Sequence, residues 1–72
     1  MKTKQWGEEH PNTYKFRRMY ANMPIPLRSS DILVIIDDEP MTAQVIRLEV
    51  DHNTKIGYKA IDQLTRLKIL RV

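Results

Sequence analysis

Acidic side chains in two parts of the chain could together hold a divalent cation. The two groups are Asp37, Asp38 and Glu39, and then Glu49, Asp51 and His52. Carboxylate oxygens with an imidazole suit Mg²⁺, Mn²⁺ or Ca²⁺. The spacing of a calcium-binding loop is missing, however, and acids beside Pro40 and Asn53 are ordinary turn and cap residues. We therefore expect structural roles for these acids and no metal site.

Other catalytic chemistry finds little support. The chain contains no cysteine, and its two glycines, Gly7 and Gly57, lie in no phosphate-binding loop. The two serines, Ser29 and Ser30, lack the surrounding sequence that makes a serine nucleophilic, and either histidine is expected to be solvated or to cap a turn. We predict a protein that is not an enzyme, with no cofactor and no small-molecule substrate.

Cations alternate with aromatic side chains over residues 14–20, a pattern that suits phosphate neutralisation and base stacking. Phe16 and Tyr20 fall on the apolar side of an expected helix, which leaves the others facing outward. Lys59 and Arg66 would extend this basic surface if two helices lie side by side. No nucleic-acid-binding motif is legible in the sequence. Nucleic-acid binding is thus the alternative function, with the candidate contacts Tyr14, Lys15, Arg17, Arg18, Lys59 and Arg66.

Charge is segregated along the chain. Residues 1–28 hold six cations and two acids, residues 29–54 one cation and six acids, and residues 55–72 five cations and one acid, for a net charge of +3. Complementary blocks of this kind can steer self-association or the docking of a protein partner. They favour a non-enzymatic interaction or regulatory module as the function.

The N-terminal part of the chain predicts a helix. Pro11, Asn12 and Thr13 are typical of a helix start, and an apolar residue then recurs every three to four positions as far as Met23. The prolines that follow lack an N–H and disfavour helix in the preceding residue, so we expect residues 23–27 to be extended.

The clearest local pattern predicts a β-hairpin. Five aliphatic residues, Ile32–Ile36, predict a strand covered on both faces; residues 37–40 predict a turn, and Thr42–Val50 alternate as a second strand would. A lone hairpin is marginal in water and leaves an open edge. A third strand from residues 23–28 or 69–72, or a second copy of the chain, would cover that edge. We predict a homodimer that associates through Ile32, Val34 and Ile36.

The last segment predicts an amphipathic helix that begins after Asn53 or Thr54 and ends near Lys68. Its expected apolar arc is Ile56, Ala60, Ile61, Leu64 and Leu67. Gly57 should weaken the first turn by roughly 1 kcal/mol relative to alanine.

Together these elements predict a small single α+β domain over residues 11–72, preceded by a flexible segment, residues 1–10. No apolar run is long enough for a membrane span, and the N-terminus lacks the apolar stretch of a signal peptide. We expect a cytoplasmic protein whose partner is a second copy or another protein, and no membrane.

Overall fold

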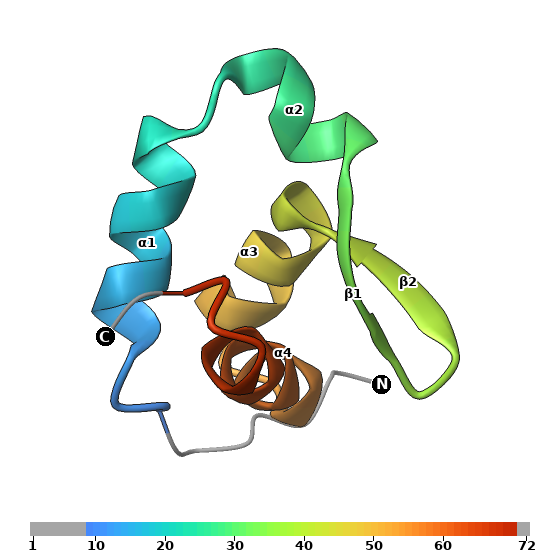
Figure 1. The fold of residues 1–72 in the computed structure, drawn as a ribbon. Coiled ribbons are helices and arrows are strands. Elements are labelled where there is room, and N and C mark those ends of the chain that lie inside the picture. Colours follow the sequence, from blue (N-terminus) through green and yellow to red (C-terminus); the bar gives the residue numbers. More distant parts are fainter. Residues whose placement is uncertain (1–8, 71–72) are drawn as a thin grey trace.

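The computed structural model describes residues 9–70, which form four helices and one antiparallel hairpin (Figure 1). In chain order the elements are α1 (Thr13–Asn22), α2 (Ile25–Ser30), β1 (Ile32–Ile36), β2 (Glu39–Thr42), α3 (Ala43–Asp51) and α4 (Lys55–Arg66). The predicted small α+β fold is confirmed. Most of the segment expected to be flexible, and the last two residues, lie outside the described part of the chain.

Helix α1 begins at Thr13, as the sequence predicts. Its apolar stripe faces the interior, where Phe16 is fully buried. Asn12 precedes the helix, and its side-chain amide donates a hydrogen bond to Thr65 Oγ1 at 3.3 Å. This bond ties the start of α1 to α4.

The prediction of an extended segment at residues 23–27 holds for Met23 and Pro24, whose ψ angles are 138° and 137°, and is wrong for the rest, because α2 begins at Ile25. Pro24 is the N-cap and Pro26 lies in the first turn. Backbone N–H groups of a first turn have no partner within the helix, so proline loses nothing there, and its fixed φ favours the helix. Leu27 closes the turn by donating its backbone N–H to the Pro24 carbonyl at 3.0 Å.

The hairpin turn is Asp37-Asp38, shorter than the predicted residues 37–40. Both aspartates have positive φ, 52° and 69°, as a two-residue turn that matches the twist of a hairpin requires. Glu39 and Pro40 already belong to β2. Proline is tolerated there because β2 lies at an edge of the two-stranded sheet.

Strand β1 is covered only in part, so the expectation of a strand buried on both faces is wrong, although Leu33 also packs partly against the core. Val34 and Ile36 point into the core, whereas Ile32 and Ile35 are 58% and 62% exposed. The sheet that residues 9–70 form has two strands, and neither residues 23–28 nor Ile69 and Leu70 join it; the rest of the second candidate segment lies outside the described residues. The reason is that one of them is α2 and the other contributes Leu70 to the core.

The predicted second strand, Thr42–Val50, is also wrong, since all of it after Thr42 is helix α3. The Thr42 side-chain oxygen caps this helix by accepting the backbone N–H of Val45 at 3.3 Å. The buried residues of α3 recur at the spacing of a helical face, and they are Ala43, Ile46 and Val50. Alternation of polar and apolar residues and helical spacing coexist in this short segment, and packing of the helical face prevails.

Helix α4 starts after Thr54, one of the two predicted caps, and ends at Arg66, two residues before the predicted end. Lys68 has a φ of 61°, and the backbone N–H of Ile69 reaches back to the Leu64 carbonyl at 3.0 Å. Such a left-handed residue reverses the chain at the end of a helix. The reversal leads Leu70 into the core, where it is 3% exposed.

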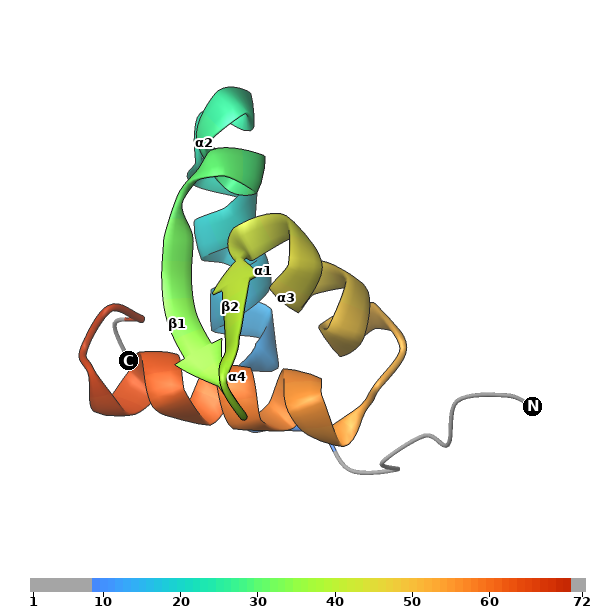
Figure 2. The same cartoon turned by 90° about the vertical axis from the view of Figure 1, so that its right-hand side faces the viewer.

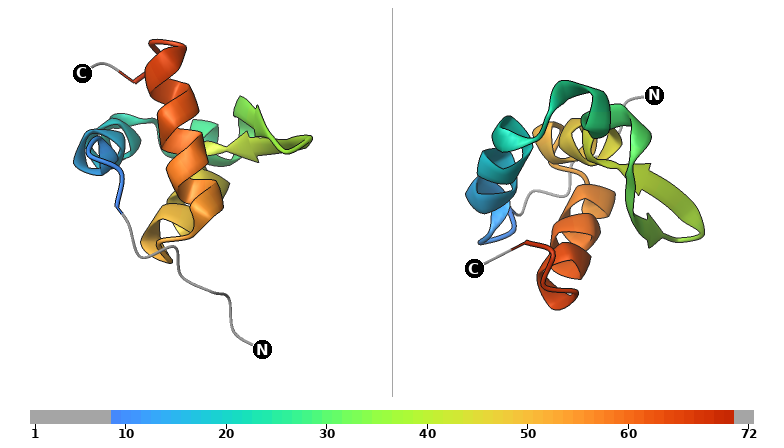
Figure 3. Two further views of the ribbon diagram at one scale, coloured as in Figure 1. Left: turned by 90° about the horizontal axis from the view of Figure 1, so that it is seen from below. Right: turned by 45° about the horizontal axis from the view of Figure 1, so that its top comes forward.

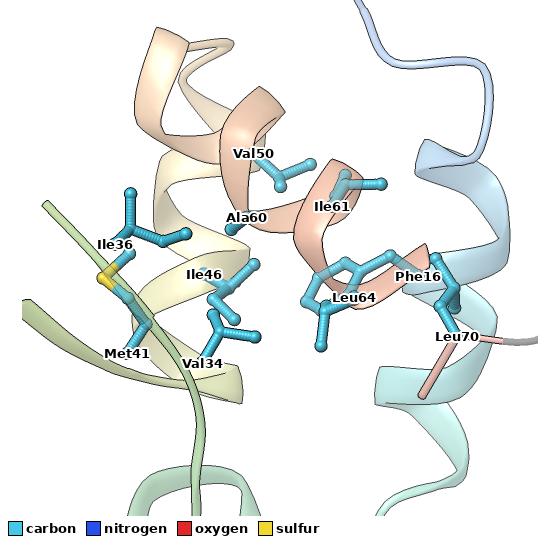
Figure 4. Packing of buried hydrophobic residues seen from close by; sticks show 10 residues of the cluster. All are labelled: Phe16, Val34, Ile36, Met41, Ile46, Val50, Ala60, Ile61, Leu64 and Leu70. Atoms are coloured by element: carbon cyan, nitrogen blue, oxygen red, sulfur yellow. The ribbon is translucent and has the colours of Figure 1, made fainter. Parts of the chain in front are cut away.

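The core lies where α3 and α4 meet the other elements. Figure 3, in the view from below, shows α4 with α1 on one side and the hairpin on the other. Ten buried side chains from every element except α2 converge there (Figure 4): Phe16, Val34, Ile36, Met41, Ile46, Val50, Ala60, Ile61, Leu64 and Leu70. Of the apolar arc predicted for α4, Ile56 and Leu67 stay partly exposed.

Candidate functional site

Helices α3 and α4 are joined by a turn of three residues, His52, Asn53 and Thr54. Asn53 adopts a φ of 54°, which redirects the chain. Its backbone N–H binds the Val50 carbonyl at 3.0 Å, and that of Thr54 binds the Glu49 carbonyl at 3.1 Å. Figure 1 views α4 nearly end-on and Figure 2 views it from the side, with α3 slanting across it, so the two helix axes cross.

The Thr54 side chain fastens this turn. Its hydroxyl oxygen accepts the backbone N–H of Gly57 at 3.1 Å, and the same hydroxyl donates to the Glu49 carboxylate. Thr54 is 8% exposed, so these bonds are largely shielded from water. One residue therefore caps α4 and also binds it to the end of α3.

Gly57 allows the two helices to approach one another closely. A Cβ placed on Gly57 would lie 2.9 Å from the backbone carbon of Glu49 and 2.9 Å from the backbone nitrogen of Val50. Both contacts are with backbone atoms, which cannot rotate away as a side chain can. The glycine thus sets the distance between α3 and α4, a role beyond the weakened helix turn that its sequence position indicates.

The side of α4 that faces away from the core forms one stripe. Lys55, Ile56, Lys59 and Arg66 are exposed on it, and Gln63 is half-buried at its margin. The spacing of these residues, three or four positions or multiples of it, places them along one face of a helix. We call this set the α4 stripe.

Ion pairs join cations of the α4 stripe to nearby acids. Lys59 Nζ lies 3.3 Å from Asp37 Oδ2 in the hairpin turn, and Arg66 Nε lies 3.1 Å from Asp62 Oδ2 one helical turn away. Asp62 is also 3.4 Å from His10 Nε2. All the lysine, arginine and aspartate side chains of these pairs are well exposed, whereas His10 is buried rather than solvated, with its Nδ1 accepting the backbone N–H of Asn12.

The cations and the tyrosine singled out on α1 do not join the α4 stripe. Tyr14, Lys15 and Arg18 border a surface cavity of about 690 Å³ together with Ile69 and Leu70. Arg17, the fourth candidate on α1, lies elsewhere, and its Nη2 atom is 3.2 Å from Asp51 Oδ1 at the end of α3. The six proposed nucleic-acid contacts are therefore distributed over separate surfaces.

The residues proposed as a self-association edge also separate. Val34 and Ile36 are buried in the core, and Ile32 is the one exposed residue of the three proposed. With Ile32, four large aliphatic side chains of α2 and β1 are exposed. These are Ile25, Leu27, Ile32 and Ile35, which we call the apolar outer face.

Acids from both groups considered for a cation make contacts with other side chains. Asp37 pairs with Lys59, Asp51 with Arg17, and Glu49 with Thr54. Across residues 9–70, no three histidine, cysteine or acidic side chains come together in a way that could hold a metal ion. Within the same range, no helix has the length and apolarity needed to cross a membrane.

The pair of helices α3 and α4 was not predicted from the sequence, because α3 was expected to be a strand. Thr42 as a helix cap and the helical spacing of Ala43, Ile46 and Val50 are the sequence features that indicate α3. Comparison of the chain with protein-family models, with curated proteins and with solved structures gives no match. The function is therefore argued from the geometry of these residues.

Proposed function

We propose that the protein binds double-stranded DNA, with α4 lying in the major groove. The observation that carries this proposal is the arrangement of α3, the three-residue turn and α4, with the α4 stripe facing outward. In helix-turn-helix proteins two helices joined by such a short turn cross each other, and the second enters the groove. The first helix then crosses the phosphate backbone.

The side chains of the α4 stripe have suitable chemistry for this contact. Residues near the start of the second helix reach base edges in such complexes, and here they are Lys55, Ile56 and Lys59. Lysine binds guanine acceptors, glutamine such as Gln63 binds adenine, and an apolar side chain can contact the thymine methyl group. The stripe thus offers both charge and the means to distinguish bases.

The ion pairs of the stripe oppose DNA binding only weakly. Exposed pairs such as Lys59 with Asp37 contribute about 0–1 kcal/mol, so exchanging the aspartate for a phosphate costs little. Each cation that meets a phosphate releases condensed counterions, which favours binding at low salt. The chain's net charge of +3 acts in the same direction.

The test is fluorescence anisotropy of a mixed-sequence duplex at several salt concentrations. We expect the logarithm of the association constant to fall linearly with the logarithm of salt concentration, with a slope of about −0.9 per phosphate contacted. Absence of salt-sensitive binding at low salt would contradict the proposal.

A pair of double variants locates the interface. Lys55→Gln with Lys59→Gln removes two cations from the α4 stripe, and Lys15→Gln with Arg18→Gln removes two from α1. We expect the first pair to reduce the steepness of the salt dependence by about 2, and the second to leave it near the wild-type value. The reverse result would move the interface to the α1 surface and end the proposal for α4.

Self-association is a second candidate function, and the apolar outer face is the observation that favours it. Ile25 is 73% exposed, and Ile32 and Ile35 lie on a strand whose outer edge pairs with no other strand among residues 9–70. Aliphatic surface beside an open strand edge suits a two-fold contact with a second copy. A dimer would also allow two copies of α4 to bind two half-sites on the DNA.

A further inference from the structure

A second concentration of positive charge lies where α1, α2 and α3 converge. Arg17 comes from α1, Arg28 from α2 and Arg47 from α3, and all three border one surface cavity of about 310 Å³. The remaining lining residues are Tyr20, Ala21 and Asp51. We call this cavity the arginine pocket.

The Tyr20 ring orders two of the guanidinium groups. The Arg28 Cζ atom lies 4.5 Å from the centre of the ring and that of Arg47 lies 5.1 Å from it, both within the range of a cation–π contact. Arg28 is held further by donating to the Met23 carbonyl at 3.2 Å and to the Ala21 carbonyl at 3.3 Å. Contacts within the chain therefore organise the pocket.

The charges of the pocket are unbalanced. Asp51 is the acid among its lining residues, with one carboxylate oxygen 3.2 Å from Arg17 Nη2 and the other 3.5 Å from Arg47 Nε. Three guanidinium groups against one carboxylate leave a local charge of +2. Each guanidinium carries five N–H donors, and the bonds to Asp51 and to the two carbonyls use only some of them.

We propose that the arginine pocket binds a phosphoryl group. The planar fork of a guanidinium matches the oxygens of a phosphate and binds them in pairs, which an ammonium cannot do. A phosphate that carries two negative charges would neutralise the local excess of +2, and one that carries a single negative charge would halve it. The cavity volume is near the lower end of small-ligand sites, roughly 300–1,000 Å³, and admits a phosphate with a small attached group.

This phosphoryl group has two sources that share the same chemistry. It can belong to a free phosphate compound, or to the backbone of the DNA that α4 is proposed to bind, since α3 is the helix that would cross the backbone. Only the second source rests on the proposed function. Each therefore has its own measurement.

For the free source, pyrophosphate and inorganic phosphate are titrated into the isotopically labelled full chain while the arginine Nε–H resonances are followed by NMR. We expect saturable shifts at Arg17, Arg28 and Arg47. Arg47→Gln should weaken binding by about tenfold, because a charge-assisted hydrogen bond is lost. Arg18→Gln, which removes an exposed arginine of α1 outside the pocket, should leave the affinity unchanged.

For the DNA source, the salt dependence of duplex binding is compared between Arg47→Gln and Arg18→Gln. A slope reduced by about 1 in the pocket variant alone assigns a backbone phosphate to the pocket. Pyrophosphate binding with an unchanged DNA slope assigns a free phosphate compound. If pyrophosphate does not bind and the slope does not change, the proposal is overturned. The pyrophosphate result is valid even if the chain binds no DNA.

Two further variants separate anion binding from a merely structural role. Arg47→Lys keeps the charge and loses the fork, so it should bind pyrophosphate more weakly than wild type and more tightly than Arg47→Gln. Asp51→Asn removes the competing carboxylate and should bind pyrophosphate more tightly. If the arginines served only to hold Asp51, this second variant would lower stability and leave pyrophosphate affinity unchanged, which would count against the pocket.

Discussion

Two surfaces of the molecule expose side chains of opposite character. The α4 stripe is polar and basic, and it lies on a helix whose position is determined by Thr54 and Gly57. The apolar outer face carries isoleucine and leucine on α2 and β1, next to an acidic turn. A charged polymer suits the first surface and another polypeptide the second, because one offers charge and hydrogen-bonding groups and the other only area to bury.

The largest effect is expected where the apolar outer face is changed. Ile32→Lys with Ile35→Lys should abolish self-association, since each isoleucine buried in a dimer contributes about 1.5–3 kcal/mol. Sedimentation velocity at several concentrations measures the outcome, with Ile56→Lys, an exposed isoleucine of α4 outside the apolar outer face, as the control. A wild-type chain that remains monomeric at high micromolar concentration would remove this candidate function.

The next effect concerns the distance between the helices. Gly57→Ala would gain about 1 kcal/mol of helix propensity, but its methyl group would meet backbone atoms of Glu49 and Val50, at a cost of about 1–3 kcal/mol. We expect a net loss in the free energy of unfolding, measured by chemical denaturation. A more stable variant would show that α3 and α4 are not as closely packed as described.

A smaller effect is expected at the cap of α4. Thr54→Val keeps the shape of the side chain and removes the hydroxyl that binds Gly57 and Glu49, so it should lower the free energy of unfolding by about 1 kcal/mol. Thr42→Val serves as a comparison because the Thr42 hydroxyl oxygen accepts the backbone N–H of Val45 in α3, the helix that Thr42 caps. Equal losses in both variants would argue against a special role for the turn.

The smallest effect concerns the ion pair between the α4 stripe and the hairpin turn. Asp37→Asn releases Lys59 from its ion pair, and an exposed pair contributes at most about 1 kcal/mol. DNA affinity should therefore rise by no more than about fivefold, with a steeper salt dependence. Asp31→Asn removes the same charge at the start of β1 and is the control; an equal rise there would point to net charge alone.

The elements predicted correctly are those that a single local pattern describes. The start of α1, the strand at Ile32–Ile36 and the cap of α4 all follow from residues within a few positions of one another. The failures at α2 and α3 arise where local patterns conflict. Prolines that end one helix also begin the next, and the alternation after Thr42 overlaps a helical spacing of buried residues.

The candidate sites depend on contacts that no local pattern describes. Lys59 and Arg66 were named from their charge, but their separation from the α1 cations follows from where α1 packs. Arg17 was grouped with its neighbours in sequence, and the fold places it instead with Arg28 and Arg47 around Tyr20.

The sequence by itself determines the size of the domain, its mixture of helix and hairpin, the lack of cysteine chemistry and the segregation of charge. These properties depend on composition and on short-range backbone preferences. Only the tertiary structure decides that α4 is presented beside α3 and that three arginines share one pocket. Gly57 illustrates the reason. A side chain at this position would clash with the backbone of α3, a helix that burial of the shared core brings against α4.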